Sequence, residues 1–344
     1  MKTFRDISIS IVIPTWNRKN ILVNCINSIL CQEIKPKEFE IIICDSHSTD
    51  GTSKEIEDYI IRNNLHELKI VQCENNNVSA KRNIGIKTAK YDYIILLDDD
   101  CVPFESFFQN YINYFQNITE NEIICGQYRT KDDDIKKSNY VRYRDSRNFY
   151  FVNNQNDNLR EELAFNRIVT GNLGFKKAQI IKADIFFNEK ILGYGCEDVD
   201  WAHRLISFGF KLNKSDIKVF HNETSLKLSN YKMKWFYMAN GSMPLLIKYN
   251  YDAASMLPMF YLEPGQTKFK YKIKAMITKL FLNKLITNLI EFILTSTDNH
   301  KFFYNTFLFK CVLLGAYVQG IKERPAIEIS EHDTRRGWYA KGSK

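Results

Sequence analysis

The sequence predicts an α/β protein with a doubly wound, mostly parallel sheet, followed by a C-terminal helical region. Short β-branched runs alternate with segments of helical apolar spacing over residues 7–98, and a later stretch interleaves lysine with large apolar residues. With 344 residues, 44% of them hydrophobic and 26% charged, the chain can form one large or two smaller domains with a packed core.

Four strands and three helices are predicted in alternation. The strands are apolar runs at residues 7–14, 40–45, 68–73 and 93–98, and the helices lie at residues 17–32, 52–64 and 79–89. Asp50 is expected to cap the second helix and Ser79 the third. Because alternating strands and helices form parallel sheets, a ligand is expected at the carboxyl ends of the strands.

Three consecutive carboxylates follow the fourth predicted strand. Side chains alternate along a strand, so Asp98 and Asp100 are expected on one side and Asp99 on the other. Two carboxylates in this D-x-D pattern form a hard oxygen site, which Mg²⁺ or Mn²⁺ completes with phosphate oxygens of a nucleotide. The alternative is a polar exit from the strand, since Asp favours turns and helix caps.

Six short segments share one order and spacing. They are IVIPTWNR (11–18), CDSHSTDGT (44–52), SAKRNIGI (79–86), LLDDD (96–100), TGNLGF (170–175) and GYGCEDVDWAHRL (193–205). Together they resemble the family 2 glycosyltransferases over roughly residues 7–222. The resemblance implies an A-type glycosyltransferase fold, a nucleotide-sugar donor, usually a UDP-sugar, a divalent metal, and inversion at the anomeric carbon. It further implies a hexosyl- or N-acetylhexosaminyltransferase.

The resemblance implies that Asp100 binds the metal. Departure of a diphosphate develops negative charge, which a bound cation offsets. His221 follows a strand-like run at residues 217–220 and is expected as a further ligand, although a lone histidine after a strand is more often not one. Arg82 is expected to reach the diphosphate or the uracil edge, and the alternative is a solvated arginine on a first helical turn.

Donor contacts are also implied by the resemblance. Asp98 and Asp99 are expected to contact ribose or sugar hydroxyls. Asp45 and Thr15 are expected to face the base. Ser46 stands where many relatives have a second acid, which leaves the identity of the nucleotide open.

The Glu197-Asp198 pair resembles the family's Glu-Asp motif. Inverting transfer needs a base that takes the proton of the acceptor hydroxyl, and we assign this role to Asp198, with Glu197 at the acceptor. Gly193 and Gly195 permit the tight backbone of a sugar pocket. Trp201 is expected to stack on the acceptor. The alternatives are an acidic first helical turn for the pair and a buried aromatic side chain for Trp201.

The net charge of +8 is confined to one segment. Residues 227–286 hold ten lysines and two acids, so their excess of eight equals the net charge of the whole chain. The remainder is neutral, which argues against a nucleic-acid partner. We predict a catalytic domain with a nucleotide-sugar half and an acceptor half, a helical region and a polar tail, at residues 1–225 (1–100 and 101–225), 226–330 and 331–344 respectively.

The lysine-rich segment at residues 268–286 has the pattern of an interfacial helix. Residues 302–321 are apolar but too polar to span a membrane. Because no signal core is visible near the N-terminus, we expect a cytoplasmic protein in peripheral contact with anionic lipid at the inner face of the membrane. The alternative is a helical subdomain with a solvated lysine face. The apolar face of the helix consists of Ile273, Met276, Ile277 and Leu280.

Three functions are compatible with these patterns. The first is a glycosyltransferase that acts on a glycan or lipid-linked acceptor in surface polysaccharide or lipooligosaccharide synthesis. A nucleotidyltransferase is the second, but it would show a glycine-rich phosphate loop where residues 14–17 read Pro-Thr-Trp-Asn. A non-catalytic, membrane-associated sugar-nucleotide binding protein is the third. Such a protein would be expected to lose the base, yet Glu197-Asp198 is intact.

Overall fold

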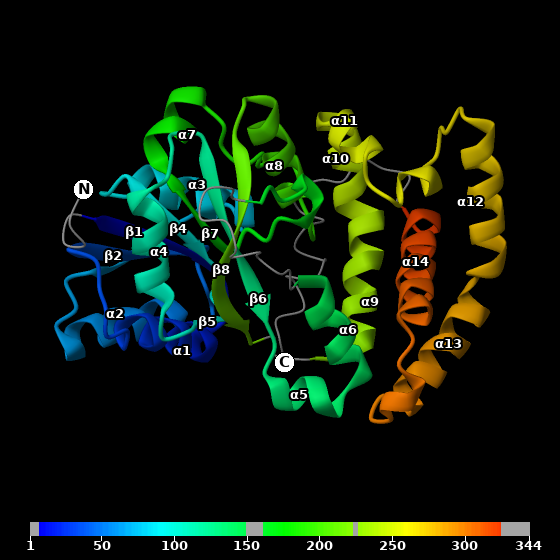
Figure 1. The fold of residues 1–344 in the computed structure, drawn as a ribbon, viewed down its shortest axis with the longest axis horizontal. Coiled ribbons are helices and arrows are strands. Elements are labelled where there is room, and N and C mark those ends of the chain that lie inside the picture. The colour runs from blue at the N-terminus through cyan, green and yellow to red at the C-terminus, as the bar shows by residue number, and fades with distance from the viewer. Residues whose placement is uncertain (1–6, 149–160, 223–225, 325–344) are drawn as a thin grey trace. The chain divides into compact units, whose positions relative to one another are not determined.

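The computed structural model of the chain describes residues 7–148, 161–222 and 226–324. Figure 1 shows the order of its helices and strands. The chain forms two compact units, unit 1 with residues 1–129, 148–189 and 201–222, and unit 2 with residues 130–147, 190–200 and 223–344. The predicted tail at residues 331–344 lies outside the described residues, and the predicted domain boundary at residue 225 stays a prediction.

Unit 1 contains a mixed sheet with the strand order β3-β2-β1-β4-β7-β6-β8-β5. β1 pairs in parallel with β2 and β4, β2 with β3, and β6 with β8, whereas β7 and β5 pair antiparallel. The prediction of a mostly parallel α/β sheet with a helical C-terminal region is confirmed. The strands are β1 (Ser8–Thr15), β2 (Glu38–Asp45), β3 (Leu68–Gln72), β4 (Tyr93–Leu97), β5 (Cys101–Pro103), β6 (Glu122–Arg129), β7 (Asn172–Lys176) and β8 (Lys211–His221).

The seven elements predicted over the first part of the chain are all present, each within two residues of its expected ends. The helices of unit 1 follow the strands in the expected alternation. They are α1 (Lys19–Leu30), α2 (Thr52–Asn63), α3 (Val78–Thr88), α4 (Phe107–Gln116) and α7 (Lys177–Ala183), with α8 (Glu197–Ser207) passing from unit 2 into unit 1.

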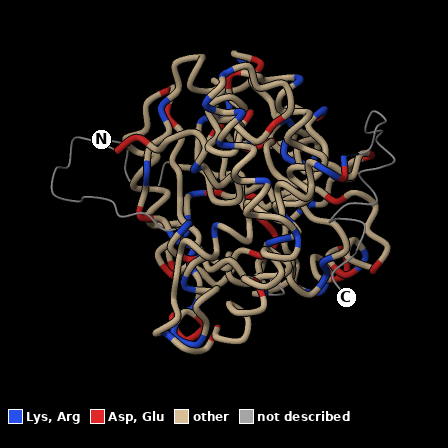
Figure 2. Tube along the Cα trace, turned by 90° about the vertical axis from the view of Figure 1, so that its right-hand side faces the viewer, with Lys and Arg blue, Asp and Glu red and all other residues tan. Residues whose placement is uncertain are grey.

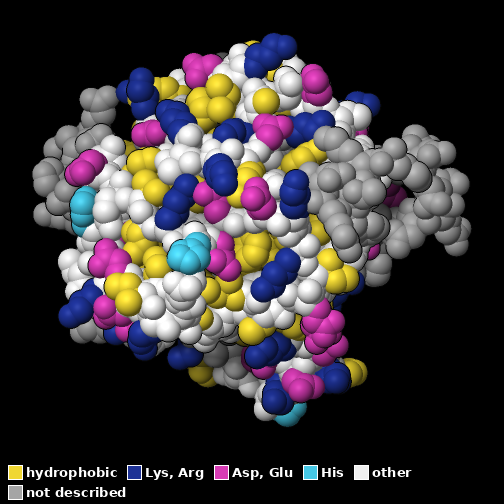
Figure 3. Space-filling view, turned by 90° about the vertical axis from the view of Figure 1, so that its left-hand side faces the viewer, with side chains coloured by type: hydrophobic (Ala, Val, Ile, Leu, Met, Phe, Trp, Pro, Cys, Tyr) yellow, Lys and Arg dark blue, Asp and Glu magenta, His cyan; other side chains and the backbone are white. Residues whose placement is uncertain are grey.

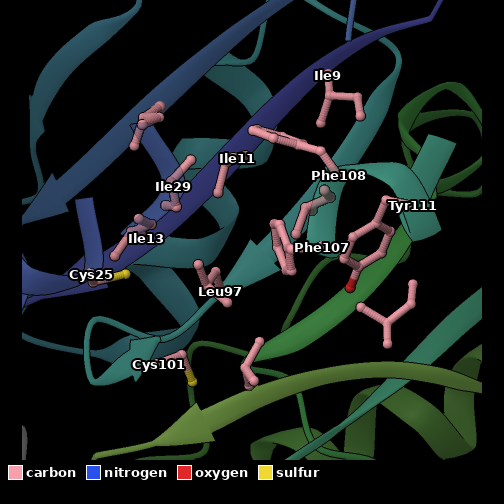
Figure 4. Close-up of a cluster of buried hydrophobic side chains, with 14 of the residues drawn as sticks. Ile9, Ile11, Ile13, Cys25, Ile29, Leu97, Cys101, Phe107, Phe108 and Tyr111 are labelled. Carbon is pink, nitrogen blue, oxygen red and sulfur yellow. The ribbon is translucent and has the colours of Figure 1, made fainter. Parts of the chain in front are cut away.

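One hydrophobic core of unit 1 consists of buried side chains from the strands and from the helices that pack on them. Ile9, Ile11 and Ile13 alternate along β1 and are fully buried, together with Phe107 and Tyr111 of α4 (Figure 4). Burying each such side chain stabilises the fold by about 1.5–3 kcal/mol. This packing fixes where each strand ends, and therefore where the polar residues after the strands lie.

Helix capping differs in detail from the expectation. The side chain of Asn77 accepts a hydrogen bond from the Ser79 amide at 2.8 Å, so Asn77 and not Ser79 caps α3. The prediction was wrong because Asn is as good a cap as Ser and stands two residues earlier. Asp50 Oδ1 accepts from the Thr52 amide at 3.0 Å at the start of α2, but Gly51 is the N-cap residue, so the predicted position of this cap is wrong by one residue.

Unit 2 is helical. α14 is its central helix, since Phe309 and Leu313 are buried together with Tyr140, Leu228 and Leu294 from other helices. Within the described residues, no helix has the length and apolar character needed to cross a membrane. The helices are α5 (Asp132–Lys137), α6 (Asn139–Asn148), α9 (Leu228–Tyr237), α10 (Met243–Tyr249), α11 (Tyr251–Ser255), α12 (Phe269–Phe281), α13 (Lys284–Ser296) and α14 (Thr306–Lys322).

Candidate active site

The three acids after β4 lie in a turn. β4 ends one residue before Asp98, so the expected alternation of side chains does not apply and the predicted pairing of Asp98 with Asp100 is wrong. Asp99 and Asp100 instead converge on one cation. Arg18 Nη1 lies 2.8 Å from Asp99 Oδ1 and 3.0 Å from Asp100 Oδ2. The turn thus presents two neighbouring carboxylates to the same point.

Asp98 accepts hydrogen bonds from two other side chains. Its Oδ1 accepts from Arg82 Nη2 at 2.9 Å, and its Oδ2 accepts from the Tyr128 hydroxyl at 2.8 Å. Arg82 is buried, with its guanidinium 5.4 Å from the Phe187 ring centroid, so the alternative of a solvated arginine is wrong. A Cβ added to Gly171 would lie 2.0 Å from the Tyr128 hydroxyl oxygen, which explains the small residue in the segment at 170–175.

Asp100 and His221 form the pair best suited to a metal ion. Asp100 Oδ1 lies 3.3 Å from His221 Nε2, and the Tyr128 ring stacks on the imidazole at 4.5 Å between centroids. Neighbouring ligand atoms around an octahedral cation with bonds of ~2.1 Å lie ~3.0 Å apart, so the spacing fits two ligands of one ion. Carboxylate with imidazole suits Mn²⁺.

The remaining metal ligands would have to come from the donor. In the part of the chain that the structure describes, no group of three or more His, Cys, Asp and Glu residues could hold a metal ion by itself. A cation of this class commonly binds one or two protein carboxylates together with substrate phosphate oxygens. The Asp100–His221 pair therefore fits a metal ion whose other ligands include phosphate oxygens of the donor.

Thr15 orients Asp99. The Thr15 hydroxyl donates to Asp99 Oδ2 at 2.8 Å, and both side chains are buried. Burial raises the pKa of Asp99, while the charge of Arg18 acts in the opposite direction. The Arg18 charge thus offsets part of the rise in the pKa of Asp99 that burial causes.

Asp45 holds the loop after β2. Its two carboxylate oxygens accept hydrogen bonds from the Ser48 hydroxyl, from the Ser48 amide at 3.0 Å and from the Ser53 hydroxyl at 2.6 Å. The side chain is fully buried. The observed role is structural, and the predicted contact of Asp45 with the base stays a prediction that requires the loop to open.

Trp201 is a packing residue. It is fully buried, its indole Nε1 donates to the Ile185 carbonyl at 2.9 Å, and its ring stacks on Phe187 at 4.3 Å between centroids. With no face open to an acceptor, the prediction that Trp201 stacks on a sugar is wrong. The alternative of a buried aromatic side chain is confirmed.

Replacement of Trp201 by Ala is therefore expected to destabilise the protein by about 3–5 kcal/mol, because it opens a large cavity. Trp201→Phe keeps the ring contact and loses the hydrogen bond, so its cost should be smaller. Urea titrations monitored by circular dichroism measure both. A Trp201→Ala variant of unchanged stability that bound its acceptor poorly would restore the sugar-stacking interpretation.

The Glu197-Asp198 pair lies on the first turn of α8. Both side chains are partly exposed, and Asp198 Oδ1 accepts from the Val199 amide at 2.8 Å. The local structure therefore agrees with the alternative stated above, an acidic first turn of a helix. The pair belongs to unit 2, whereas the acids at residues 98–100 belong to unit 1, and the predicted catalytic roles of the pair stay predictions.

Two residues of this site escaped sequence reasoning. Arg18 ends the segment at residues 11–18, which extends beyond the first strand. The sequence therefore already placed a positive charge near the edge of the sheet where the acids gather. Tyr128 gave no signal. It lies on β6, and only the pairing of β6 with β8 brings it to His221.

Comparison with known proteins identifies the domain. Residues 10–178 match the model described as Glycosyl transferase family 2. The chain carries a family 2 glycosyltransferase domain. The family expected from the six sequence segments is thereby confirmed. This domain contains β1, β4 and the three acids, while His221 and the Glu197-Asp198 pair follow it in the chain.

Relatives of the family 2 domain are similar over part of their length. The glycosyltransferase GlyG of Streptococcus pneumoniae serotype 4 is 31% identical over 168 residues, which cover 48% of this chain and 50% of GlyG. TarP of Staphylococcus aureus, a poly(ribitol-phosphate) beta-N-acetylglucosaminyltransferase, is 32% identical over 122 residues, or 35% of this chain and 36% of TarP. The chain thus spans half or less of the length of these relatives.

A solved structure supports the A-type fold. The mannosyltransferase PcManGT from Pyrobaculum calidifontis, in complex with GDP-Man and Mn²⁺, matches with a TM-score of 0.56 at 12% identity, covering 92% of this chain and 88% of that chain. The expected A-type fold is confirmed.

Proposed function

We propose that the chain is an inverting, metal-dependent glycosyltransferase. It moves a sugar from a nucleotide-sugar, a UDP-sugar, to a hydroxyl of a glycan or lipid-linked acceptor in the synthesis of surface polysaccharide or lipooligosaccharide. The observation that carries this proposal is the Asp100–His221 pair at 3.3 Å, next to Asp99 and Arg18 in a family 2 domain. The pair supplies an oxygen and a nitrogen ligand at the edge where α/β folds bind nucleotides.

Each residue of the cluster has a part in the proposed reaction. Asp100 and His221 hold a divalent cation, Mn²⁺ or Mg²⁺, which offsets the charge of the leaving diphosphate when bound. Thr15 and Arg18 fix Asp99 toward the donor. Asp98, held by Arg82 and Tyr128, stabilises the turn that carries all three acids, and its predicted sugar contact is part of this proposal.

The base deprotonates the acceptor. Asp198 takes the proton of the attacking hydroxyl while the bond from the anomeric carbon to the diphosphate oxygen breaks, and Glu197 binds the acceptor. Attack from the face opposite the leaving group inverts the configuration. The name of TarP, an N-acetylglucosaminyltransferase, supports a hexosyl or N-acetylhexosaminyl group as the one transferred.

One experiment separates the three candidate functions. The purified protein is incubated with individual UDP-sugars, Mn²⁺ and a glycan acceptor, and the released products are quantified. A glycosyltransferase releases UDP and extends the acceptor, and a nucleotidyltransferase releases pyrophosphate or consumes it. A binding protein retains the donor unchanged. Release of no nucleotide under any donor, although the donor binds, would contradict the proposal.

A membrane surface is the proposed location. α12 and α13 expose large apolar side chains, with Leu285 83%, Phe292 69% and Met276 65% accessible, beside a lysine-rich stretch. Figure 2 views the chain from the side of these helices, with Lys and Arg in blue. Apolar residues beside lysines suit an anionic bilayer, because they combine insertion with charge attraction. We place the contact at the inner face of the cell membrane. Acidic and basic side chains are interspersed on the face drawn in Figure 3, so that face is not the uniformly basic surface typical of nucleic-acid binding.

The double substitution Leu285→Glu with Phe292→Glu is expected to lower binding to anionic vesicles at least about tenfold, because each apolar side chain contributes up to about 1.5–3 kcal/mol when buried. Flotation with phosphatidylglycerol vesicles measures this. Ile61→Glu on α2, which replaces a side chain that is 77% exposed, is the matched control. Equal binding of all three proteins, or a dimer of the parent that the double substitution dissociates, would contradict the membrane contact.

A further inference from the structure

The loop before the Glu197-Asp198 pair has an unusual backbone. We call residues 190–196 the base loop; all of them belong to unit 2. Gly193 and Gly195 have φ angles of +92° and +76°, and Cys196, which is not a glycine, has +72°. A non-glycine residue rarely adopts this conformation and persists in it only where the surrounding structure enforces it. The base loop therefore needs a frame that holds it.

The first part of the frame is a π-helical turn after α9. The buried Ser242 ends this turn (Met238–Ser242), and its hydroxyl donates to the Tyr194 carbonyl at 2.7 Å. Lys234 of α9 is also buried, with Nζ 5.4 Å from the Tyr194 ring centroid. Single π-turns inside helices are rare and concentrate at functional sites. The wide turn places a hydroxyl against the base loop.

The second part of the frame is one asparagine side chain. Asn250 Nδ2 donates to Asp200 Oδ1 at 2.9 Å, and Asp200 is 1% exposed. Asn250 Oδ1 accepts from the Ala253 amide at 3.2 Å and thus caps α11. The cap fixes the direction of the amide, so its donor is aimed at the first turn of α8. A buried carboxylate without such donors is costly.

We propose that Asn250 is a positioning residue for the transfer reaction: it holds Asp200, and with it the helical turn on which Asp198 accepts the acceptor proton. This inference rests on the proposed function. The donor-side acids at residues 98–100 belong to unit 1, so loosening Asn250 should affect the chemical step and leave donor affinity intact. Small displacements of a catalytic group, near 1 Å, can cost ~10²-fold in rate.

The central test is Asn250→Asp. Asp caps helices as well as Asn does, so α11 keeps its cap while a carboxylate replaces the donor that faces Asp200. We expect kcat to fall on the order of 10–100-fold. The Kd for the UDP-sugar with Mn²⁺, measured by calorimetry, should stay within about twofold, because the hydrogen bonds described for the Asn250 side chain join it to Asp200 and Ala253, both in unit 2. Asn250→Ser, which also caps but is too short to reach Asp200, serves if the Asp variant does not fold.

An exchange variant provides the decisive readout. Asp200→Asn combined with Asn250→Asp restores an amide–carboxylate hydrogen bond with the roles reversed, and we expect it to recover most of the lost kcat. Asn305→Ala is the control, because Asn305 caps α14 in the same unit by accepting from the Phe307 amide. It should lower the melting temperature without lowering kcat.

The outcomes separate this inference from the proposed function. If Asp198→Asn is inactive while Asn250→Asp keeps the parent kcat, the positioning role is overturned and the proposed base survives. If the exchange variant stays as slow as Asn250→Asp, or if Asn305→Ala slows the reaction equally, Asn250 is merely structural. If Asp198→Asn itself transfers sugar at the parent rate, the proposed function loses its base whatever Asn250 does.

Discussion

Substitution of Asp198 by Asn is expected to lower kcat by about 10²–10⁴-fold, the range supplied by a general base. Asn has nearly the shape of Asp but cannot accept the proton of the acceptor hydroxyl. Because Asp198 lies in unit 2 and the donor-side acids lie in unit 1, donor binding should persist. Initial rates of UDP release at saturating donor and acceptor measure kcat, and calorimetry with a UDP-sugar and Mn²⁺ measures donor affinity.

The neighbouring carboxylate offers a matched control. Glu197→Gln removes one charge from the same first turn of α8. If Glu197 binds the acceptor, this variant should raise the KM for the acceptor more than it lowers kcat. An active Asp198→Asn beside an inactive Glu197→Gln would exchange the two roles. Donor hydrolysis that ignores both substitutions would remove the pair from the chemical step.

The fold of unit 1 was predictable because short-range sequence patterns determine its strands and helices. Runs such as Ile41, Ile42 and Ile43 are buried on both faces of the sheet, which gives continuous apolar strands between helices of clear periodicity. The carboxyl ends of those strands, and hence the general place of the site, follow from the same pattern.

The details of the site depend on contacts that sequence spacing does not encode. Strand alternation failed at Asp98 because β4 ends one residue earlier, and the turn then sends Asp99 to Arg18, 81 positions away in the chain. Trp201 was predicted to contact a ligand because the sequence alone does not distinguish a buried aromatic residue near a motif from an exposed one. Its ring packs against Phe175 and Phe187, and Phe187 lies on a segment for which the sequence predicts no helix or strand.

The contacts around the base loop were also not predictable from sequence spacing, because they join residues far apart in the chain. Asn250 and Asp200 are 50 positions apart, and neither lies in a periodic pattern that would pair them. The lysine-rich character of residues 227–286 suggested a membrane face. The same stretch contains Ser242, whose hydroxyl donates to the Tyr194 carbonyl, and Asn250, whose side-chain amide donates to Asp200 on the first turn of α8.

Removal of divalent cations with EDTA is expected to abolish sugar transfer. At a Mn²⁺ concentration that saturates the parent protein, Asp100→Asn is expected to leave less than about 1% of the parent kcat/KM. Loss of the charged one of two protein ligands lowers the transition-state stabilisation that the bound metal supplies by several kcal/mol. Each 1.36 kcal/mol lost corresponds to a tenfold lower rate. Titration of activity with Mn²⁺ gives the half-saturating concentration, and electron paramagnetic resonance of bound Mn²⁺ with UDP gives binding without turnover.

The matched control for this prediction lies on the strand that carries His221. Asp216→Asn removes an exposed carboxylate of β8 whose side chain accepts from the Tyr114 hydroxyl at 3.3 Å, far along the strand from the cluster. It should keep the parent requirement for Mn²⁺, because a general change of surface charge does not alter ligation. His221→Ala should shift the Mn²⁺ titration in the same direction as Asp100→Asn, since the two atoms lie 3.3 Å apart. Full activity in EDTA would mean that the diphosphate leaves without a metal. A His221→Ala variant with an unchanged Mn²⁺ titration would remove His221 from the proposed ligands.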